Sequence, residues 1–229
     1  MSSAALVASE GKLLGRIGAE QLEIEPLGDQ AIRVRATQNS AFDAQLPSGL
    51  LDRPPAAPAA RLTIAGERAT LVNGGLTLSV VVTQRLLGPS LDLTFRETES
   101  GRILLQEAAP HLLYPTAREH VPLGGALWHI QTTFAADPEE QFFGLGQHQN
   151  GRLNQKGCVI DLVQKNTEVV VPFLLSSRGY GLLWNAPGVG RVELAHNCSI
   201  PDEHIAPRRS ALFMARSVLG EVRDRRTTC

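Results

Sequence analysis

The chain has 229 residues, which is long enough for one large β-domain or for two small domains. Hydrophobic residues make up 43% of the sequence and charged residues 20%, as in ordinary globular proteins, so the composition favours a folded chain over a disordered one. The formal net charge of −1 argues against a nucleic-acid-binding protein, because such proteins carry a basic face that displaces counterions from phosphate.

The N-terminus and the cysteines suggest a reducing compartment. Residues Met1–Leu14 lack a cationic segment followed by a long apolar run, so we expect neither a signal peptide nor a membrane-spanning helix. A cytoplasmic protein without a membrane partner is the default expectation. Cys158, Cys198 and Cys229 are widely spaced and form no Cys-x-x-Cys unit, which fits neither a disulfide framework nor a zinc site. The histidines also lack metal-ligand spacing, and we expect no metal and no cofactor.

Short segments of alternating apolar and polar residues recur from Gln21 to about Glu193, separated by glycine, proline and asparagine. This pattern is typical of an antiparallel β-domain. Residues Ala31–Ala36 alternate as a half-buried strand does, with isoleucine and valine on one face and arginines on the other. The segments Arg68–Val72 and Leu76–Thr83 flank Asn-Gly-Gly, whose residues tolerate positive φ, and we expect a hairpin there.

The segments Leu91–Glu97 and Arg102–Glu107 predict a second hairpin. Two stretches interrupt the strand pattern: Asp52–Ala60, rich in proline and alanine, reads as a surface loop, and Ala108–Gly125 as an irregular segment. Before the last thirty or so residues no convincing helical period is visible. The predicted fold is therefore all-β, an antiparallel β-sandwich of two twisted sheets, followed by an irregular or helical C-terminal tail.

Downstream of the strand Trp128–Phe134, an acidic turn leads to two phenylalanines and then to Gly144, Leu145 and Gly146. Two glycines so close together indicate a need for backbone freedom, or for close approach by another segment without an intervening Cβ. A dinucleotide-binding loop is excluded, because Gln149 stands where that motif needs its third glycine and no helical pattern follows.

The run Val169–Leu175 is almost continuously apolar, which is typical of a strand buried on both faces. Pro172 has no backbone N–H, so this strand should have an edge or a bulge at that position. In the next strand the two-residue period predicts that Tyr180, Leu182 and Trp184 share one face. Such an aromatic face either stacks on sugar rings or packs in the core.

The block from Phe142 to Asn185 resembles the N-terminal, galactose-mutarotase-like β-sandwich of family 31 glycoside hydrolases, and most closely that of the α-xylosidases. The resemblance lies in Phe-Phe-Gly-Leu-Gly-Gln-His-Gln-Asn-Gly-Arg-Leu-Asn and in Val-Pro-Phe-Leu-Leu-Ser-Ser-Arg-Gly-Tyr-Gly-Leu-Leu-Trp-Asn. It implies a chain related to enzymes that hydrolyse α-linked oligosaccharides or xylosides. In that family the catalytic carboxylates lie on a (β/α)₈ barrel downstream, and a barrel of about 250 residues does not fit within this chain.

The resemblance also places the loop after Gly-Leu-Gly near the mouth of the sugar site. Gln147, His148 and Asn150 supply the donors and acceptors that grip sugar hydroxyls, and Trp184 offers a stacking surface. These four residues are the candidate substrate-binding residues, although many family members carry an acidic residue where this chain has Gln147. The alternative is that the three polar residues are solvated turn residues and that Trp184 belongs to the core.

The two carboxyl groups that a retaining glycosidase holds about 5 Å apart are not recognisable in this sequence. The Trp-x-Asp-Met-like motif that carries the family's nucleophile is missing, and we interpret Glu139, Glu140, Asp161 and Glu168 as surface charges. We therefore predict no catalytic residue and an accessory domain that is inactive by itself. A stand-alone sugar-binding module and an aldose-mutarotase-like isomerase remain as alternatives.

The resemblance ends after Leu194, so the expected organisation is a sandwich domain over residues 1–195 and a divergent basic tail over residues 196–229. Leu212, Ala215, Leu219 and Val222 share one face if the tail is helical, with arginines outside it. One hypothesis is that the tail is translated out of the ancestral reading frame. The other is a native regulatory tail or a basic docking helix.

Overall fold

The computed structural model describes residues 4–42, 59–86, 88–109, 116–124, 127–186, 188–195 and 212–219. Within these ranges the chain forms strands and turns and no helix, which confirms the predicted all-β class. The strands belong to four antiparallel sheets, here called A to D, where a two-sheet sandwich was expected. None of the described residues lies in a helix long and apolar enough to span a membrane.

Sheet A is a meander in the order β1-β2-β3-β4. Its strands are β1 (Ala5–Ser9), β2 (Lys12–Ile17), β3 (Glu20–Leu27) and β4 (Ala31–Thr37). The strand pattern thus starts before Gln21, the point at which sequence periodicity placed it. The β1–β2 turn is made by Glu10 and Gly11, both at positive φ, and glutamate gives no Asn-Gly signature to mark the turn.

Sheet B is a second meander, in the order β5-β6-β7-β8-β9. Its strands are β5 (Arg61–Ala65), β6 (Arg68–Asn73), β7 (Leu76–Arg85), β8 (Gly88–Glu97) and β9 (Ile103–Gln106). The β6–β7 hairpin turns at Gly74 and Gly75, and the β8–β9 pair follows, so both predicted hairpins are confirmed. The predicted loop Asp52–Ala60 lies outside the described residues except for its last two.

Sheets C and D contain the later strands. Sheet C has the order β10-β11-β17-β16-β13, and sheet D the order β12-β14-β15. Their bounds are β10 (Arg118–Gly124), β11 (Leu127–Ala135), β12 (Phe142–Gln147), β13 (Val159–Leu162), β14 (Val169–Ser176), β15 (Tyr180–Leu183), β16 (Gly188–Leu194) and β17 (Leu212–Leu219).

Two sequence-based predictions are wrong in sheet C. Arg118–Gly124 is the edge strand β10, where an irregular segment was expected, and its Pro122 suits an edge that needs no donor on its outer side. Leu212–Leu219 is the strand β17, where an irregular or helical tail was expected. It pairs with β11 on one side and β16 on the other, and this two-sided backbone pairing overrides the helical spacing of its apolar residues. The rest of the tail lies outside the described residues.

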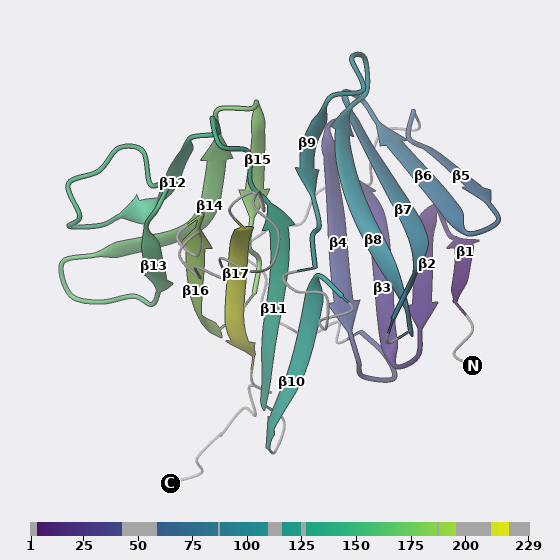
Figure 1. Cartoon of the computed structure of the whole chain (residues 1–229), viewed down its shortest axis with the longest axis horizontal. Helices are drawn as coiled ribbons and strands as arrows, with labels where there is room; N and C mark the ends of the chain where they lie inside the picture. The colour runs from purple at the N-terminus through teal and green to yellow at the C-terminus, as the bar shows by residue number, and fades with distance from the viewer. Residues whose placement is uncertain are drawn as a thin grey trace, which may run out of the picture.

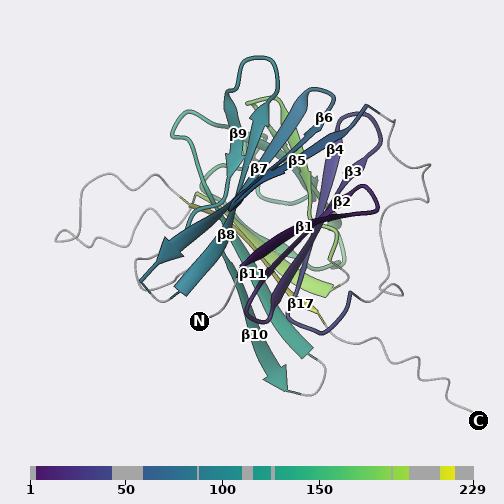
Figure 2. The same ribbon diagram turned by 90° about the vertical axis from the view of Figure 1, so that its right-hand side faces the viewer.

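The four sheets enclose two hydrophobic cores. One core lies between sheets A and B, and includes Leu22, Ile24, Leu71, Leu78 and Leu93. The other gathers residues of sheets C and D with Leu105 of β9. Phe95 of β8 packs against both cores, and a bridge between Glu107 and Phe134 joins the end of β9 to β11. Figure 1 shows sheets A and B in the right-hand half and sheets C and D in the left-hand half. Figure 2 brings sheet A (purple) and sheet B (blue) to the front.

Candidate functional site

The Gly-Leu-Gly motif lies in β12, opposite a bulge in β14. Gly144 pairs with Leu174 and Gly146 pairs with Val170, so three residues of β14 face the single residue Leu145. The three residues are Val171–Phe173, and the predicted irregularity at Pro172 is therefore confirmed. Leu145 takes a positive φ of 67°, and its side chain is buried in the core between sheets C and D.

Both glycines of the motif are required by close backbone approach. A Cβ on Gly144 would lie 2.6 Å from the carbonyl oxygen of Phe173, and a Cβ on Gly146 would lie 2.0 Å from that of Val169. Their φ values of 94° and 105° add a backbone conformation that other residues rarely adopt. The two reasons that the sequence suggested for the glycines, backbone freedom and close approach, are both present.

The loop that follows β12 is tied down by its own side chains. The His148 ring lies with Nε2 2.9 Å from the Leu145 carbonyl oxygen and Nδ1 3.9 Å from Glu168 Oε2, and only 7% of the side chain is exposed. Asn150 donates from Nδ2 to Gln155 Oε1 at 2.7 Å and accepts from the Arg152 N–H at 3.1 Å. Polar groups of both residues are thus engaged within the loop, as turn residues commonly are.

Gln147 and Trp184 lie on opposite sides of the first half of β14. Gln147 is exposed at the end of β12, where it pairs with Val169. Trp184 donates its backbone N–H to the Pro172 carbonyl oxygen at 2.8 Å, and its side chain packs against the core between sheets C and D. Within the described part of the chain, the buried indole Nε1 has no hydrogen-bond partner. A sugar-binding role of the four candidate residues stays a prediction.

Tyr180, Leu182 and Trp184 all pack against this same core, which confirms that they share a face. Glu140, which the sequence suggested as a surface charge, is instead buried. Its carboxylate accepts hydrogen bonds from Ser176 Oγ and, at 2.7 Å, from Tyr180 Oη. Burial, and then the neighbouring Glu140 carboxylate, raise the pKa of the Tyr180 hydroxyl, so Tyr180 stays a hydrogen-bond donor.

Asp161 does lie at the surface, as predicted. It pairs with Arg191 at 2.9 Å and with Lys165 at 3.4 Å. The hydrogen bond from Arg191, opposed by slight burial, lowers the pKa of Asp161. Exposed pairs of this kind contribute little to stability.

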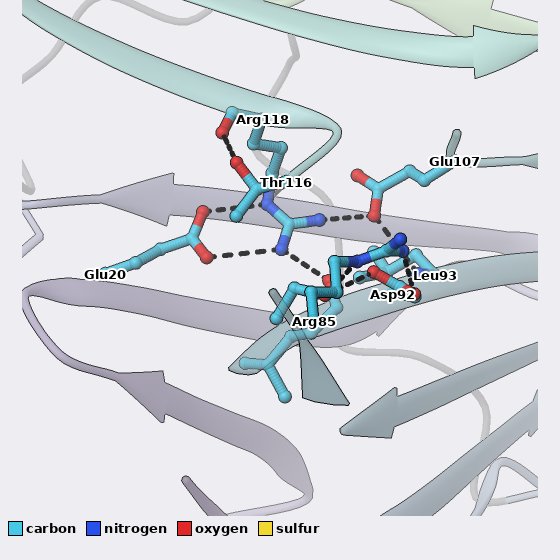
Figure 3. Close-up of polar contacts among 9 residues, drawn as sticks. Glu20, Arg85, Asp92, Leu93, Glu107, Thr116 and Arg118 are labelled. Carbon is cyan, nitrogen blue, oxygen red and sulfur yellow. Dashed lines mark hydrogen bonds and ion pairs between the residues drawn. The ribbon is translucent and has the colours of Figure 1, made fainter. Parts of the chain in front are cut away.

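Sequence reasoning missed a buried ion network centred on Arg118 (Figure 3). The Arg118 guanidinium donates to Glu20 Oε1 at 2.9 Å, to Glu107 Oε2, and to the Leu91 carbonyl oxygen at 2.7 Å. The Leu93 N–H donates to the same Glu107 oxygen at 3.1 Å. Each residue looks ordinary in the sequence, and Glu20 is 98 positions from Arg118, so no local motif marks the network.

This network links sheets A, B and C, since Glu20 begins β3, Glu107 follows β9 and Arg118 begins β10. Burial raises the pKa of Glu107 although Arg118 opposes the shift. Burial disfavours the Arg118 charge, but the two carboxylates outweigh it and raise its pKa. Both carboxylates are buried against one guanidinium, so they serve as a clamp between sheets rather than as an acid–base pair open to a sugar.

One face of sheet D is apolar and exposed, which contradicts the expectation that Val169–Leu175 is buried on both faces. The side chains that alternate outward along β14 are 49%, 47%, 39% and 49% exposed at Val169, Val171, Phe173 and Leu175. The cross-strand pairs Phe143–Leu175 and Phe173–Leu183 extend this face onto β12 and β15. The six residues are called here the β14 face: Phe143, Val169, Val171, Phe173, Leu175 and Leu183.

Comparisons with known proteins agree with the fold. Residues 21–193 match the family model of the glycosyl hydrolase 31 N-terminal galactose mutarotase-like domain. An uncharacterised family 31 glucosidase from Pseudescherichia vulneris is 32% identical over 194 residues, which are 80% of this chain and 36% of that protein. α-Xylosidase A from Aspergillus niger is 29% identical over 187 residues, which are 77% of this chain and 25% of that protein.

A crystal structure of a family 31 α-xylosidase from a soil metagenome, complexed with xylose, has a TM-score of 0.75 and 26% identity. The match covers 94% of this chain and 32% of that chain. The chain thus spans between a quarter and about a third of the length of these relatives. Because the family model covers most of the sequence, the chain belongs to the N-terminal galactose mutarotase-like domains of glycosyl hydrolase family 31.

Proposed function

We propose that this chain is the accessory β-sandwich of a family 31 α-glycosidase of the α-xylosidase type. Its role is to support the catalytic part and to form one edge of the site for an α-linked oligosaccharide or xyloside. It does not hydrolyse glycosides by itself. The observation that carries the proposal is the family match over residues 21–193, combined with coverage of only 36% and 25% of two relatives.

The buried carboxylates of the described residues favour a non-catalytic role. Glu20 and Glu107 are buried on Arg118, and Glu140 is buried beneath Ser176 and Tyr180. Hydrolysis with retention needs two carboxyl groups that both reach the glycosidic bond. Carboxylates that are buried and hydrogen-bonded within the protein lack that access.

Gln147 is the candidate residue best suited to contact a sugar. It is exposed, whereas the His148 ring and the Asn150 amide already make contacts within the loop. A side-chain amide both donates and accepts, and one hydrogen bond to a neutral hydroxyl contributes about 1 kcal/mol. The role of His148 and Asn150 is to hold the loop in place beside Gln147, and Trp184 packs against the core on the other side of β14.

The accessory role is tested by replacing the matched segment of the Pseudescherichia vulneris glucosidase with the full 229-residue chain. We expect this fusion to hydrolyse aryl α-glucosides or α-xylosides, and the glucosidase without any sandwich to be inactive or unstable. A fusion that is no more active than the glucosidase lacking its sandwich would overturn the proposal.

The contribution of Gln147 is tested in the same fusion. We expect Gln147→Ala to raise KM about three- to tenfold, since a lost neutral hydrogen bond of about 1 kcal/mol corresponds to that range. Gln149→Ala, a change at a neighbouring exposed residue, serves as the control and should leave KM unchanged. Equal KM values for the two variants would show that Gln147 does not contact the sugar.

A further inference from the structure

The central strand of sheet D carries an apolar sequence on a face that the described chain leaves uncovered. Outward from β14 lie Val169, Val171, Phe173 and Leu175, all between one third and one half exposed. A sheet with one face in water normally alternates apolar and polar residues, whereas a continuous apolar run is typical of a strand covered on both sides. The sequence of β14 is therefore that of a covered strand.

The outer faces of sheets A and B differ from this face of sheet D. The central strand of sheet B, β7, directs Leu78, Val80 and Val82 inward, and its outward residues are Thr77, Ser79, Val81 and Thr83. On sheet A, Lys12 pairs with Glu23 and Glu25, and Arg33 and Arg35 extend the network. The water-facing sides of sheets A and B are thus largely polar, and that of sheet D is not.

The β14 face is also already shaped for a flat contact. The Phe173 ring lies against the backbone of Gly181, where an added Cβ would be 2.7 Å from the ring Cζ. Because glycine has no side chain, the ring can pack flat against the backbone of β15. Because the ring position is fixed by the strand beneath it, little side-chain freedom remains to be lost when a partner covers the face.

We propose that the β14 face is the surface on which the remaining polypeptide of a family 31 protein docks, an inference that rests on the proposed function. The chain covers 36% of the Pseudescherichia vulneris glucosidase and 32% of the soil-metagenome α-xylosidase, so most of each relative lies outside the matched part. Neighbouring apolar side chains exposed together on one sheet face are typical of an interaction surface.

The polar surroundings of the face support the same docking partner. Gln147 pairs with Val169, so the loop with the candidate sugar-binding residues lies at the rim of the apolar face. Stable interfaces combine an apolar centre with a polar rim in this way. A partner that covers β14 therefore lies next to Gln147, as a catalytic domain that shares its sugar site with this loop must.

The test compares two double variants, each in the free 229-residue chain and in the fusion with the Pseudescherichia vulneris glucosidase. Val171→Lys with Leu175→Lys changes the β14 face. Val7→Lys with Leu14→Lys is the matched control, because these residues form an exposed apolar cross-strand pair on sheet A. Thermal unfolding is measured for the wild type and both double variants, as free chains and as fusions. Hydrolysis of an aryl α-glycoside is measured for the fusions.

In the free chain both double variants should melt within about 2 °C of the wild type, because exposed substitutions cost little. In the fusion, the β14-face variant should melt about 5 °C or more below the wild type and lose activity, since two charges become buried at the interface. The control should behave as the wild type in both settings.

Two results would overturn the assignment of the face. One is that the fusion is active but the β14-face variant of the fusion melts at the same temperature as the control variant. The accessory role would then still stand. The other is a β14-face variant whose melting temperature falls as much in the free chain as in the fusion. Its side chains would then be packed within the chain itself. A wild-type fusion that is neither folded nor active would overturn the proposed function and the docking face together.

Discussion

Gly146 is the residue at which an added methyl group would be least tolerated. A Cβ there would collide with the Val169 carbonyl oxygen at 2.0 Å, and that oxygen belongs to the backbone of the central strand of sheet D. We expect Gly146→Ala to lower the free energy of unfolding by about 3 kcal/mol or more, because both strain and a backbone clash are introduced.

Gly151→Ala is the control for this change. Gly151 also has a positive φ, of 67°, but an added Cβ would meet nothing within 4 Å. Its cost should be limited to about 1 kcal/mol of backbone strain. Urea unfolding measures both values, and a Gly146→Ala variant as stable as Gly151→Ala would show that the strands can separate at no cost.

Arg118 is the second residue with a large expected effect. Arg118→Met leaves the Glu20 and Glu107 carboxylates buried without their cation. We expect the free energy of unfolding at neutral pH to fall by about 3–5 kcal/mol. Arg85→Met removes a partly exposed pair with Asp92 and should lower the free energy of unfolding by about 1 kcal/mol or less.

The Arg118 variant should also change how stability depends on pH. Burial already raises the pKa of Glu107, and loss of the guanidinium raises it further. A carboxyl group whose pKa is higher in the folded state stabilises the fold only while it is protonated, so its contribution is lost as pH rises. The difference in free energy of unfolding between the wild type and Arg118→Met should therefore become smaller as pH falls from neutral toward about 5. A difference that is independent of pH would mean that both carboxylates are hydrated.

Some of these residues could be predicted from the sequence and others could not. Gly144 and Gly146 stand in a short motif whose chemistry is local, so their roles were predictable. The Glu20–Arg118 pair and the Glu140–Tyr180 hydrogen bond join residues 98 and 40 positions apart. A glutamate in a polar turn gives no local sign that tertiary packing will bury it.

At the scale of elements, β17 decides whether sheet C is continuous. Ala215 pairs with Thr132 of β11 and with Val192 of β16, so the strand joins the two halves of the sheet. We expect Ala215→Pro to cost about 3 kcal/mol or more, since proline removes a donor from a central ladder. Ala8→Pro in the edge strand β1 should cost much less.

Circular dichroism during urea unfolding measures both proline variants. If Ala215→Pro is as stable as the wild type, Leu212–Leu219 does not form the central strand, and the hypothesis of a tail foreign to the sandwich gains support. The sequence could not predict β17, because its apolar spacing fits a helix as well as a strand. Only the neighbours β11 and β16, which are distant in sequence, select the strand.

The two hairpins and the bulge at Pro172 were predictable, because turn residues and prolines act locally. The exposed side of β14 was not. Periodicity shows that Val169–Leu175 is apolar on both faces. It does not show whether the segment that packs against the second face belongs to the same chain. The mismatch between a two-sided apolar strand and a one-sided core is the element-scale basis for the docking face.

At the scale of the whole molecule, the chain is a scaffold held together by two cores and a buried ionic clamp. Phe95 contacts both cores, and Arg118 connects sheets A, B and C, so the two halves of the domain are joined by apolar and by ionic contacts. A rigid scaffold of this kind can hold an exposed face and the neighbouring Gln147 loop in one orientation. This is what an accessory domain beside a sugar site requires.

The central claim is that the chain supports glycoside hydrolysis without performing it. The most direct measurement is the release of p-nitrophenol from p-nitrophenyl α-xyloside and α-glucoside by the purified 229-residue chain, alone and within the glucosidase fusion. We predict no release above buffer by the chain alone and clear turnover by the fusion. Hydrolysis by the chain alone, at a rate that follows the protein through successive purification steps, would contradict the claim.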